Sequence, residues 1–155
     1  MQLEQYQDNK YREFQQKLIV SSYPLLGIRI PLLRKIAKSI DYDEFINGFN
    51  PVYYEDVILY GIVLVKEKDE KKRIKLIEDY IKYIDCWSIC DTFCANLSFI
   101  KKDLDKYLDW VLEFLNDERT FYVRFGLVML LKYYCDCKYL ERVLDAILKI
   151  ASDSY

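Results

Sequence analysis

Apolar residues recur with the period of an α-helix along almost the whole chain, and this pattern restricts the fold more than any other feature. Valine and isoleucine fall in i, i+3, i+4 patterns and never in sustained alternation, so strands are not expected. Only four glycines and three prolines are present, which favours long helices over a turn-rich β fold. We predict an all-α protein. The expected helices are residues 5–20, 31–40, 42–47, 54–66, 69–84, 87–97, 102–115, 118–134 and 138–151.

The helices after residue 54 fall into three pairs, and their short connections predict antiparallel neighbours. Trp87 and Phe121 lie 34 residues apart, each just inside the first helix of its pair. Repetition at this period predicts an α-solenoid of HEAT or armadillo type, in which equivalent helices line one curved, ligand-binding face. A plain helical bundle is the alternative. The pairs are 54–66 with 69–84, 87–97 with 102–115, and 118–134 with 138–151.

Local signals indicate where individual helices begin and end. Pro31 suits the first position of a helix, because its missing N–H has no helical partner there. Gly48 suits the end of the short helix 42–47. Asn116 and Asp117 are good N-cap residues, so we expect them to cap the helix 118–134.

The last residues of the chain also look like a helix start. Ser152, Asp153 and Ser154 are typical N-cap residues, which suggests that a further helix begins there. A chain of 155 residues is long enough for one core. We therefore expect a single HEAT-like helical-repeat domain over residues 1–155, truncated at its C-terminus.

Charge and targeting signals narrow the class of protein. The net charge is −2, so there is no global basic signal for nucleic acid, although residues 1–40 carry seven Lys/Arg against three Asp/Glu. The polar N-terminus lacks the apolar core of a signal peptide, and no apolar run reaches the roughly 18 residues of a membrane span. An odd number of cysteines, five, fits a reducing compartment. We expect a cytoplasmic protein that does not bind membranes.

The cysteines do not resemble a metal site. Cys86, Cys90 and Cys94 follow an i, i+4, i+8 spacing, whereas zinc sites usually present Cys-x2-Cys pairs. Buried free thiols are the better interpretation. The chain has no histidine and no glycine-rich phosphate loop, so we expect no metal and no cofactor. Any catalysis must use carboxylates, tyrosine, lysine or arginine.

Three residues form the candidate catalytic group. Trp87 and Asp91 are spaced i and i+4, so they share one face of a helix. Arg124 follows Asp91 by 33 residues, about one helical repeat, which predicts that it lies level with Asp91 on a neighbouring helix. A half-buried carboxylate needs a partner, and Arg124 suits that role. The alternative is a core tryptophan beside a structural Asp–Arg ion pair.

A basic element near the N-terminus is the candidate DNA contact. Arg29, Arg34, Lys35 and Lys38 flank the start of the helix 31–40. They could contact phosphates through their side chains, with the helix N-terminus contributing. The alternative is an ordinary solvated amphipathic helix.

Three segments together resemble the DNA alkylation repair family of HEAT-like DNA glycosylases, the AlkD group. They are Gly-Ile-Arg-Ile-Pro at 27–31 with the helix that follows, Asp-Cys-Trp-Ser-Ile-Cys-Asp at 85–91, and Glu-Arg-Thr-Phe-Tyr-Val-Arg-Phe-Gly at 118–126. Their order and spacing agree with the family, and the similarity covers roughly residues 10–155.

The resemblance implies an α-solenoid that binds duplex DNA in a concave basic cleft and removes N3- and N7-alkylated purines. It implies that Trp87 is the active-site tryptophan, Asp91 the catalytic aspartate and Arg124 the active-site arginine. In the family a further helix supplies another aromatic residue, and we expect this chain to lack that helix. The expected function is therefore a base-excision repair glycosylase acting on alkylated duplex DNA. The alternative is a non-catalytic HEAT-like module that binds DNA or a protein.

Overall fold

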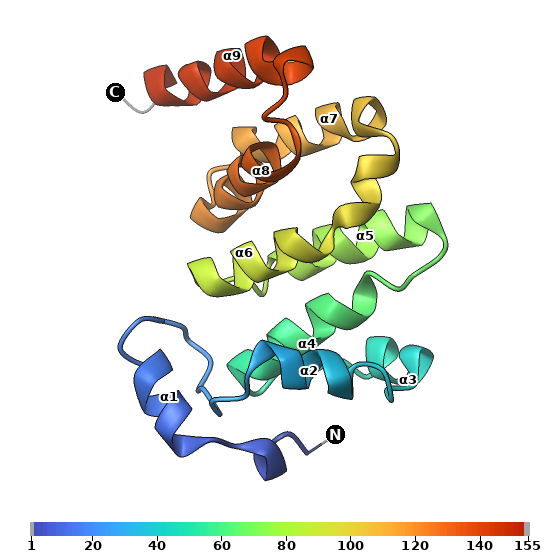
Figure 1. Cartoon of the computed structure of the whole chain (residues 1–155). Helices are drawn as coiled ribbons and strands as arrows, with labels where there is room; N and C mark the ends of the chain where they lie inside the picture. The colour runs from blue at the N-terminus through green and yellow to red at the C-terminus, as the bar shows by residue number, and fades with distance from the viewer. Residues whose placement is uncertain (1, 154–155) are drawn as a thin grey trace. The chain divides into compact units, whose positions relative to one another are not determined.

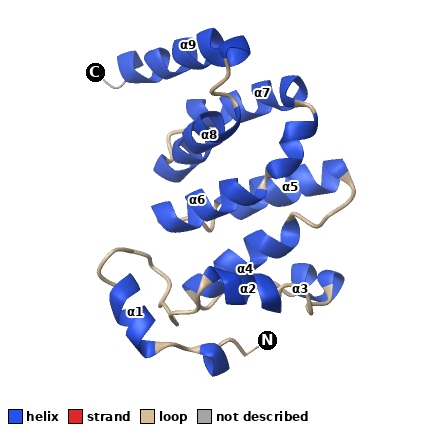
Figure 2. Ribbon diagram, in the orientation of Figure 1, coloured by secondary structure: helices blue, strands red, loops and turns tan. Residues whose placement is uncertain are grey.

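The computed structural model describes residues 2–153, with side chains for residues 2–150. All secondary structure in this described part is helical, which confirms the all-α prediction (Figure 2). The residues gather into two compact units, Met1–Asn96 and Leu97–Tyr155. None of the helices within residues 2–153 is long and apolar enough to span a membrane.

The first unit is built around one fully enclosed helix, α4 (Tyr54–Leu64). Ten of its eleven residues are buried. It contacts four other helices of the unit. Those helices are α2 (Ile30–Ile36), α3 (Tyr42–Asn47), α5 (Glu70–Ile81) and α6 (Trp87–Asn96), and the unit begins with η1 (Glu4–Tyr6) and α1 (Asn9–Gln15) (Figure 1).

A row of aromatic rings fills the core of the first unit. Tyr60 stacks on Phe49 with ring centroids 3.7 Å apart, and Tyr80 packs on Phe93 at 4.2 Å. Gly61 lets these rings approach α4, because a Cβ there would lie 2.9 Å from the Tyr80 hydroxyl oxygen. The same hydroxyl donates to the carbonyl oxygen of Val57 at 3.1 Å, so its polar atom is satisfied inside the core.

Helix α1 is much shorter than the predicted helix 5–20. It spans Asn9–Gln15, and η1 precedes it. The chain leaves the helix after Gln16 because residues 18–22 bind the start of α6 through Asp85 and Trp87. These tertiary contacts override the local helical pattern. Helix α2 likewise ends at Ile36, before the predicted residue 40, whereas α3 ends before Gly48 as predicted.

The second unit packs around the close contact of α8 (Thr120–Tyr133) with η3 (Phe114–Asn116). It also contains η2 (Ser98–Lys102), α7 (Leu104–Glu113) and α9 (Cys137–Asp153). Gly126 on α8 allows this contact, because a Cβ there would lie 2.8 Å from Leu115 Cδ2. Phe114 and Phe125 meet edge to face beside it, with ring centroids 4.8 Å apart.

Two predicted helix starts in the second unit are wrong. The N-cap of α8 is Arg119, without a side-chain cap, and Asp117 instead accepts hydrogen bonds from the Arg119 backbone and guanidinium. Helix α9 continues through Ser152 to Asp153, so no new helix starts at these two residues. Ser154, the third residue of that prediction, lies outside the described residues.

Candidate active site

Trp87 is the first residue of α6, and its side chain faces solvent. It is 46% exposed, so the alternative of a core tryptophan is wrong. Its indole Nε1 donates a long hydrogen bond of 3.4 Å to the carbonyl oxygen of Leu18. An exposed indole held at its nitrogen leaves an aromatic face available for a ligand.

Asp91 follows Trp87 by one turn of α6 and is half-buried. The opposite side of the helix is fully buried and carries Ile89 and Phe93. The structure therefore places a carboxylate and an indole on the outer part of one helix. This pairing agrees with the i, i+4 spacing in the sequence.

Arg124 lies in the second unit, in the middle of α8, and is half-exposed. It precedes the buried Phe125 and Gly126, which fix the backbone at this point against α7 and η3. Trp87 and Asp91 belong to the first unit and Arg124 to the second. The convergence of all three residues stays a prediction.

The four predicted DNA-binding residues all have exposed side chains. Arg29 stacks over the ring of Tyr11, with 4.0 Å from its guanidinium carbon to the ring centroid, and pairs with Asp8 at 3.7 Å. Arg34 donates to Asn96 at the end of α6 at 3.4 Å. The remaining two, Lys35 and Lys38, project from α2 and the turn that follows it.

Asp85 ties an N-terminal loop to the start of α6, a contact that sequence analysis missed. Its carboxylate accepts hydrogen bonds from the hydroxyl of Ser21 at 2.9 Å and from the backbone N–H of Ser22 at 2.5 Å. The Ser22 hydroxyl donates to the same carboxylate at 2.6 Å. The only sequence signal was the position of Asp85 within the segment 85–91 that resembles the family.

Glu55 is a second carboxylate that sequence analysis missed. It is completely buried in the first turn of α4. Three consecutive backbone N–H groups donate to it, from Leu26 at 2.9 Å, Gly27 at 2.7 Å and Ile28 at 3.1 Å. The turn that it holds needs Gly27, whose φ of +84° favours glycine. Glu55 thus fixes the chain directly before Arg29 and α2.

The cysteines beside the candidate site are not suited to nucleophilic catalysis. Cys86, Cys90 and Cys94 are buried free thiols, as predicted, whereas Cys135 and Cys137 are exposed. Burial raises the pKa of the Cys86 thiol to about 11, so it stays protonated at neutral pH. Among residues 2–150, no three acidic or sulfur side chains are grouped as metal ligands would be.

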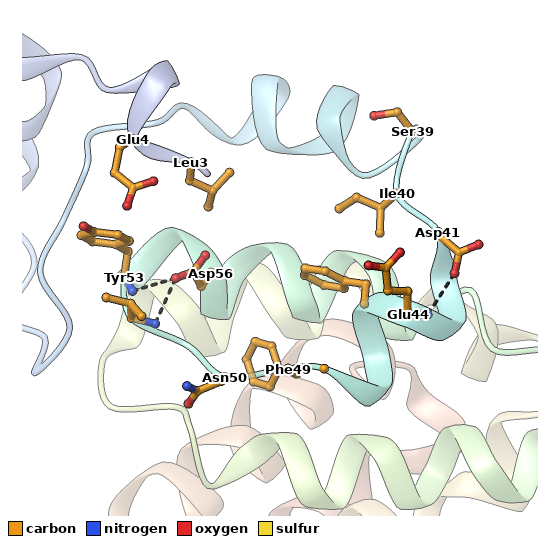
Figure 3. A pocket seen from close by; sticks show the side chains of 13 residues that line it. Leu3, Glu4, Ser39, Ile40, Asp41, Glu44, Phe49, Asn50, Tyr53 and Asp56 are labelled. Atoms are coloured by element: carbon orange, nitrogen blue, oxygen red, sulfur yellow. Dashed lines mark hydrogen bonds between the residues drawn. The ribbon is translucent and has the colours of Figure 1, made fainter. Parts of the chain in front are cut away.

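A cavity of the first unit is acidic and lies apart from the candidate site. It measures about 550 Å³, and none of its lining residues belongs to α6 (Figure 3). Asp41 and Asp56 line it, and both accept backbone N–H groups at helix starts. Glu4 lies beside Tyr53, and its charge raises the pKa of that phenol. A cavity of this charge does not suit DNA phosphate.

Comparison with known proteins identifies the family. A family model described as "DNA alkylation repair enzyme" matches residues 1–155. No curated protein and no solved structure matches the chain. The family points to a role in the repair of alkylated DNA, and therefore to DNA as the partner. Because the match covers the whole sequence, the chain belongs to the DNA alkylation repair enzyme family.

Proposed function

We propose that the protein is a DNA glycosylase that hydrolyses the N-glycosidic bond of cationic N3- and N7-alkylated purines in duplex DNA. The observation that carries this proposal is the exposed indole of Trp87 one helical turn before the half-buried carboxylate of Asp91. Membership of an alkylation repair family supports it. In this proposal the helix pairs form an α-solenoid, as the family resemblance implies.

Asp91 stabilises the positive charge that develops as the bond breaks. Alkylation at N3 or N7 makes the purine cationic, so the base leaves without a general acid. The deoxyribose then gains oxocarbenium character, as in glycoside hydrolysis. A carboxylate about 4 Å away, at an effective dielectric constant of about 20, contributes roughly 4 kcal/mol. That corresponds to a rate gain on the order of a thousandfold.

Trp87 and Arg124 hold the substrate in this mechanism. The exposed indole face of Trp87 contacts the sugar or the cationic base, and a cation–π contact contributes roughly 0.5–2 kcal/mol. Arg124 binds a phosphate and orients the Asp91 carboxylate through charge-assisted hydrogen bonds. Asp91 also orients or deprotonates the attacking water.

The exposed cations on and beside α2 bind the DNA backbone in this proposal. Arg34, Lys35 and Lys38 are the main contacts, and Arg29 contributes from the turn held by Glu55. Each phosphate contact releases counterions, so binding weakens as salt increases. Removing one such contact should reduce the slope of the logarithm of the DNA-binding constant, plotted against the logarithm of the salt concentration, by about 1.

Release of 7-methylguanine or 3-methyladenine from alkylated duplex DNA tests the proposed reaction. Asp91→Asn keeps the shape of the side chain and removes its charge, so it should reduce release by on the order of a thousandfold. Asp79→Asn, an exposed aspartate on α5, makes the same charge change in the same unit and serves as the control. An Asp91→Asn protein that releases base at the wild-type rate would rule out the assigned role.

A DNA-binding module without catalysis is the second candidate. The modest net charge of −2 favours it, because it differs from that of a broadly basic DNA enzyme. Salt-dependent binding of alkylated duplex with no release of base by the wild-type protein would identify this function.

A further inference from the structure

The carboxylate of Asp85 is unusually well supplied with hydrogen-bond donors. Both of its oxygens lie within 3.0 Å of the Ser21 hydroxyl, and one also accepts from the N–H and hydroxyl of Ser22. These bonds join residues more than sixty positions apart in sequence. Hydrogen bonds to a charged acceptor are the stronger class, so this contact is the main clamp on the loop.

The clamped loop is also the hydrogen-bond partner of the Trp87 indole. Leu18, three residues before Ser21, supplies the carbonyl oxygen that accepts from Trp87 Nε1 at 3.4 Å. Asp85 and Trp87 are two residues apart at the start of α6. One loop is therefore attached to both residues, by a strong contact at Asp85 and a weak one at Trp87.

Packing alone holds this loop only weakly. Leu18 is 56% exposed and Val20 is 88% exposed. Within residues 18–22, which form this loop, only Ile19 is buried. A long hydrogen bond at a half-exposed indole is also easily lost to water. The position of the Leu18 carbonyl, and with it the orientation of the indole, therefore depends on the Asp85 clamp.

Asp85 itself is not placed to act as a catalyst. Both of its oxygens already accept from loop donors, so neither is directed at a substrate. Asp91, one turn after Trp87, is the carboxylate that shares the outer part of α6 with the indole. The two aspartates near Trp87 thus have separate roles.

We propose that Asp85 is a positioning residue: by clamping Ser21 and Ser22 it holds the Leu18 carbonyl against Trp87 and fixes the indole in its active orientation. The importance of that orientation for catalysis rests on the proposed glycosylase function. The clamp itself can be tested without any activity. Loss of the clamp should lower the rate of the chemical step while leaving the affinity for DNA almost unchanged, because no DNA contact is removed.

Fluorescence of Trp87 tests the clamp directly. The chain has two tryptophans, so a Trp110→Phe background leaves Trp87 as the only tryptophan, and excitation at the red edge avoids the tyrosines. In this background, Asp85→Ala should lower the fluorescence anisotropy of Trp87 and raise its quenching by acrylamide about twofold. The double variant Ser21→Ala/Ser22→Ala removes both hydroxyl donors and leaves only the Ser22 backbone N–H, so it should change the anisotropy and the quenching in the same direction if Asp85→Ala folds poorly. Unchanged anisotropy in both folded variants would overturn the inference.

Asp41→Ala is the matched control, because it also removes an aspartate that accepts a backbone N–H. Asp41 caps α3 through the N–H of Glu44 and does not touch the loop. It should leave the Trp87 anisotropy unchanged. A fall of the same size in this variant would show a general loss of order and would overturn the inference.

Kinetics on a duplex carrying a single 7-methylguanine tests the consequence for catalysis. Asp85→Ala should reduce kcat by about 10- to 100-fold and change KM by less than about twofold, the range expected for a misplaced group. A loosened indole with full kcat would overturn the positioning role. If the wild-type protein releases no base, the proposed function fails, and the anisotropy result alone still supports or overturns the clamp.

Discussion

Replacement of Glu55 by glutamine tests whether a buried carboxylate holds the turn before α2. In the native protein, Oε1 accepts from Gly27 and Ile28, and Oε2 accepts from Leu26. Glutamine supplies only one oxygen. If that oxygen keeps the Gly27 and Ile28 bonds, the amide nitrogen faces the N–H of Leu26, and two donors meet inside the core.

The expected cost follows from these three bonds. A hydrogen bond to a charged group contributes about 1.5–3 kcal/mol, and a buried unsatisfied donor costs about 1–3 kcal/mol. Glu55→Gln loses one bond and weakens two, so we expect the free energy of unfolding to fall by about 2–4 kcal/mol. Domains are usually stable by about 5–15 kcal/mol, so the variant should still fold.

Urea unfolding in the Trp110→Phe background measures this loss, because Trp87 then reports on the first unit alone. The midpoint should fall with an unchanged m value. Glu44→Gln makes the same chemical change at an exposed position on α3 and should alter stability by less than about 0.5 kcal/mol. A loss below about 1 kcal/mol for Glu55→Gln would refute the reasoning. It would show that the three hydrogen bonds do not contribute as bonds to a charged acceptor should.

Gly27→Ala should destabilise the same turn, because a Cβ at φ +84° would lie 2.3 Å from the Asp8 carbonyl oxygen; an unchanged Tm in thermal unfolding would contradict this. The two exposed thiols should react quickly with a thiol reagent in the native protein, and the three buried thiols only as the protein unfolds; five equal rates would argue against the burial described above. The ammonium of Lys72 lowers the pKa of Glu67 from 4.5 to about 2. Because the folded pKa is the lower one, the stabilisation is complete above pH 4.5 and is lost as the pH falls towards 2. Glu67→Gln should flatten this part of the curve of stability against pH, and a curve identical to that of the wild type would contradict the ion pair.

Most helices could be predicted from the sequence because their signals are local. The run of apolar residues at 54–66 and the stop at Gly48 both depend on neighbours along the chain, and α4 and α3 match them closely. The helix 5–20 was predicted too long because its end is set by Asp85, more than sixty residues away. Periodicity carries no information about such a distant partner.

The candidate site could be predicted only in part, for a similar reason. The i, i+4 spacing of Trp87 and Asp91 is a local property and fixes their common helix face. Spacing could not distinguish a core tryptophan from an exposed one, since that depends on what packs against α6. Glu55 was missed because an acidic residue in the first turn of a helix is common, and its burial becomes visible only once residues 26–28 fold over it.

The enclosed helix α4 has a consequence for how the chain folds during synthesis. With eleven residues, it is shorter than the roughly 12–15 residues at which an isolated helix is even marginally stable. Its partner α6 ends at Asn96, 32 residues after Leu64, and must be made before the core can close. At about 5–20 residues per second, the ribosome needs on the order of seconds for that stretch. During that interval the most apolar segment of the first unit has no partner, so it should be the main chaperone-binding and aggregation-prone region of the nascent chain.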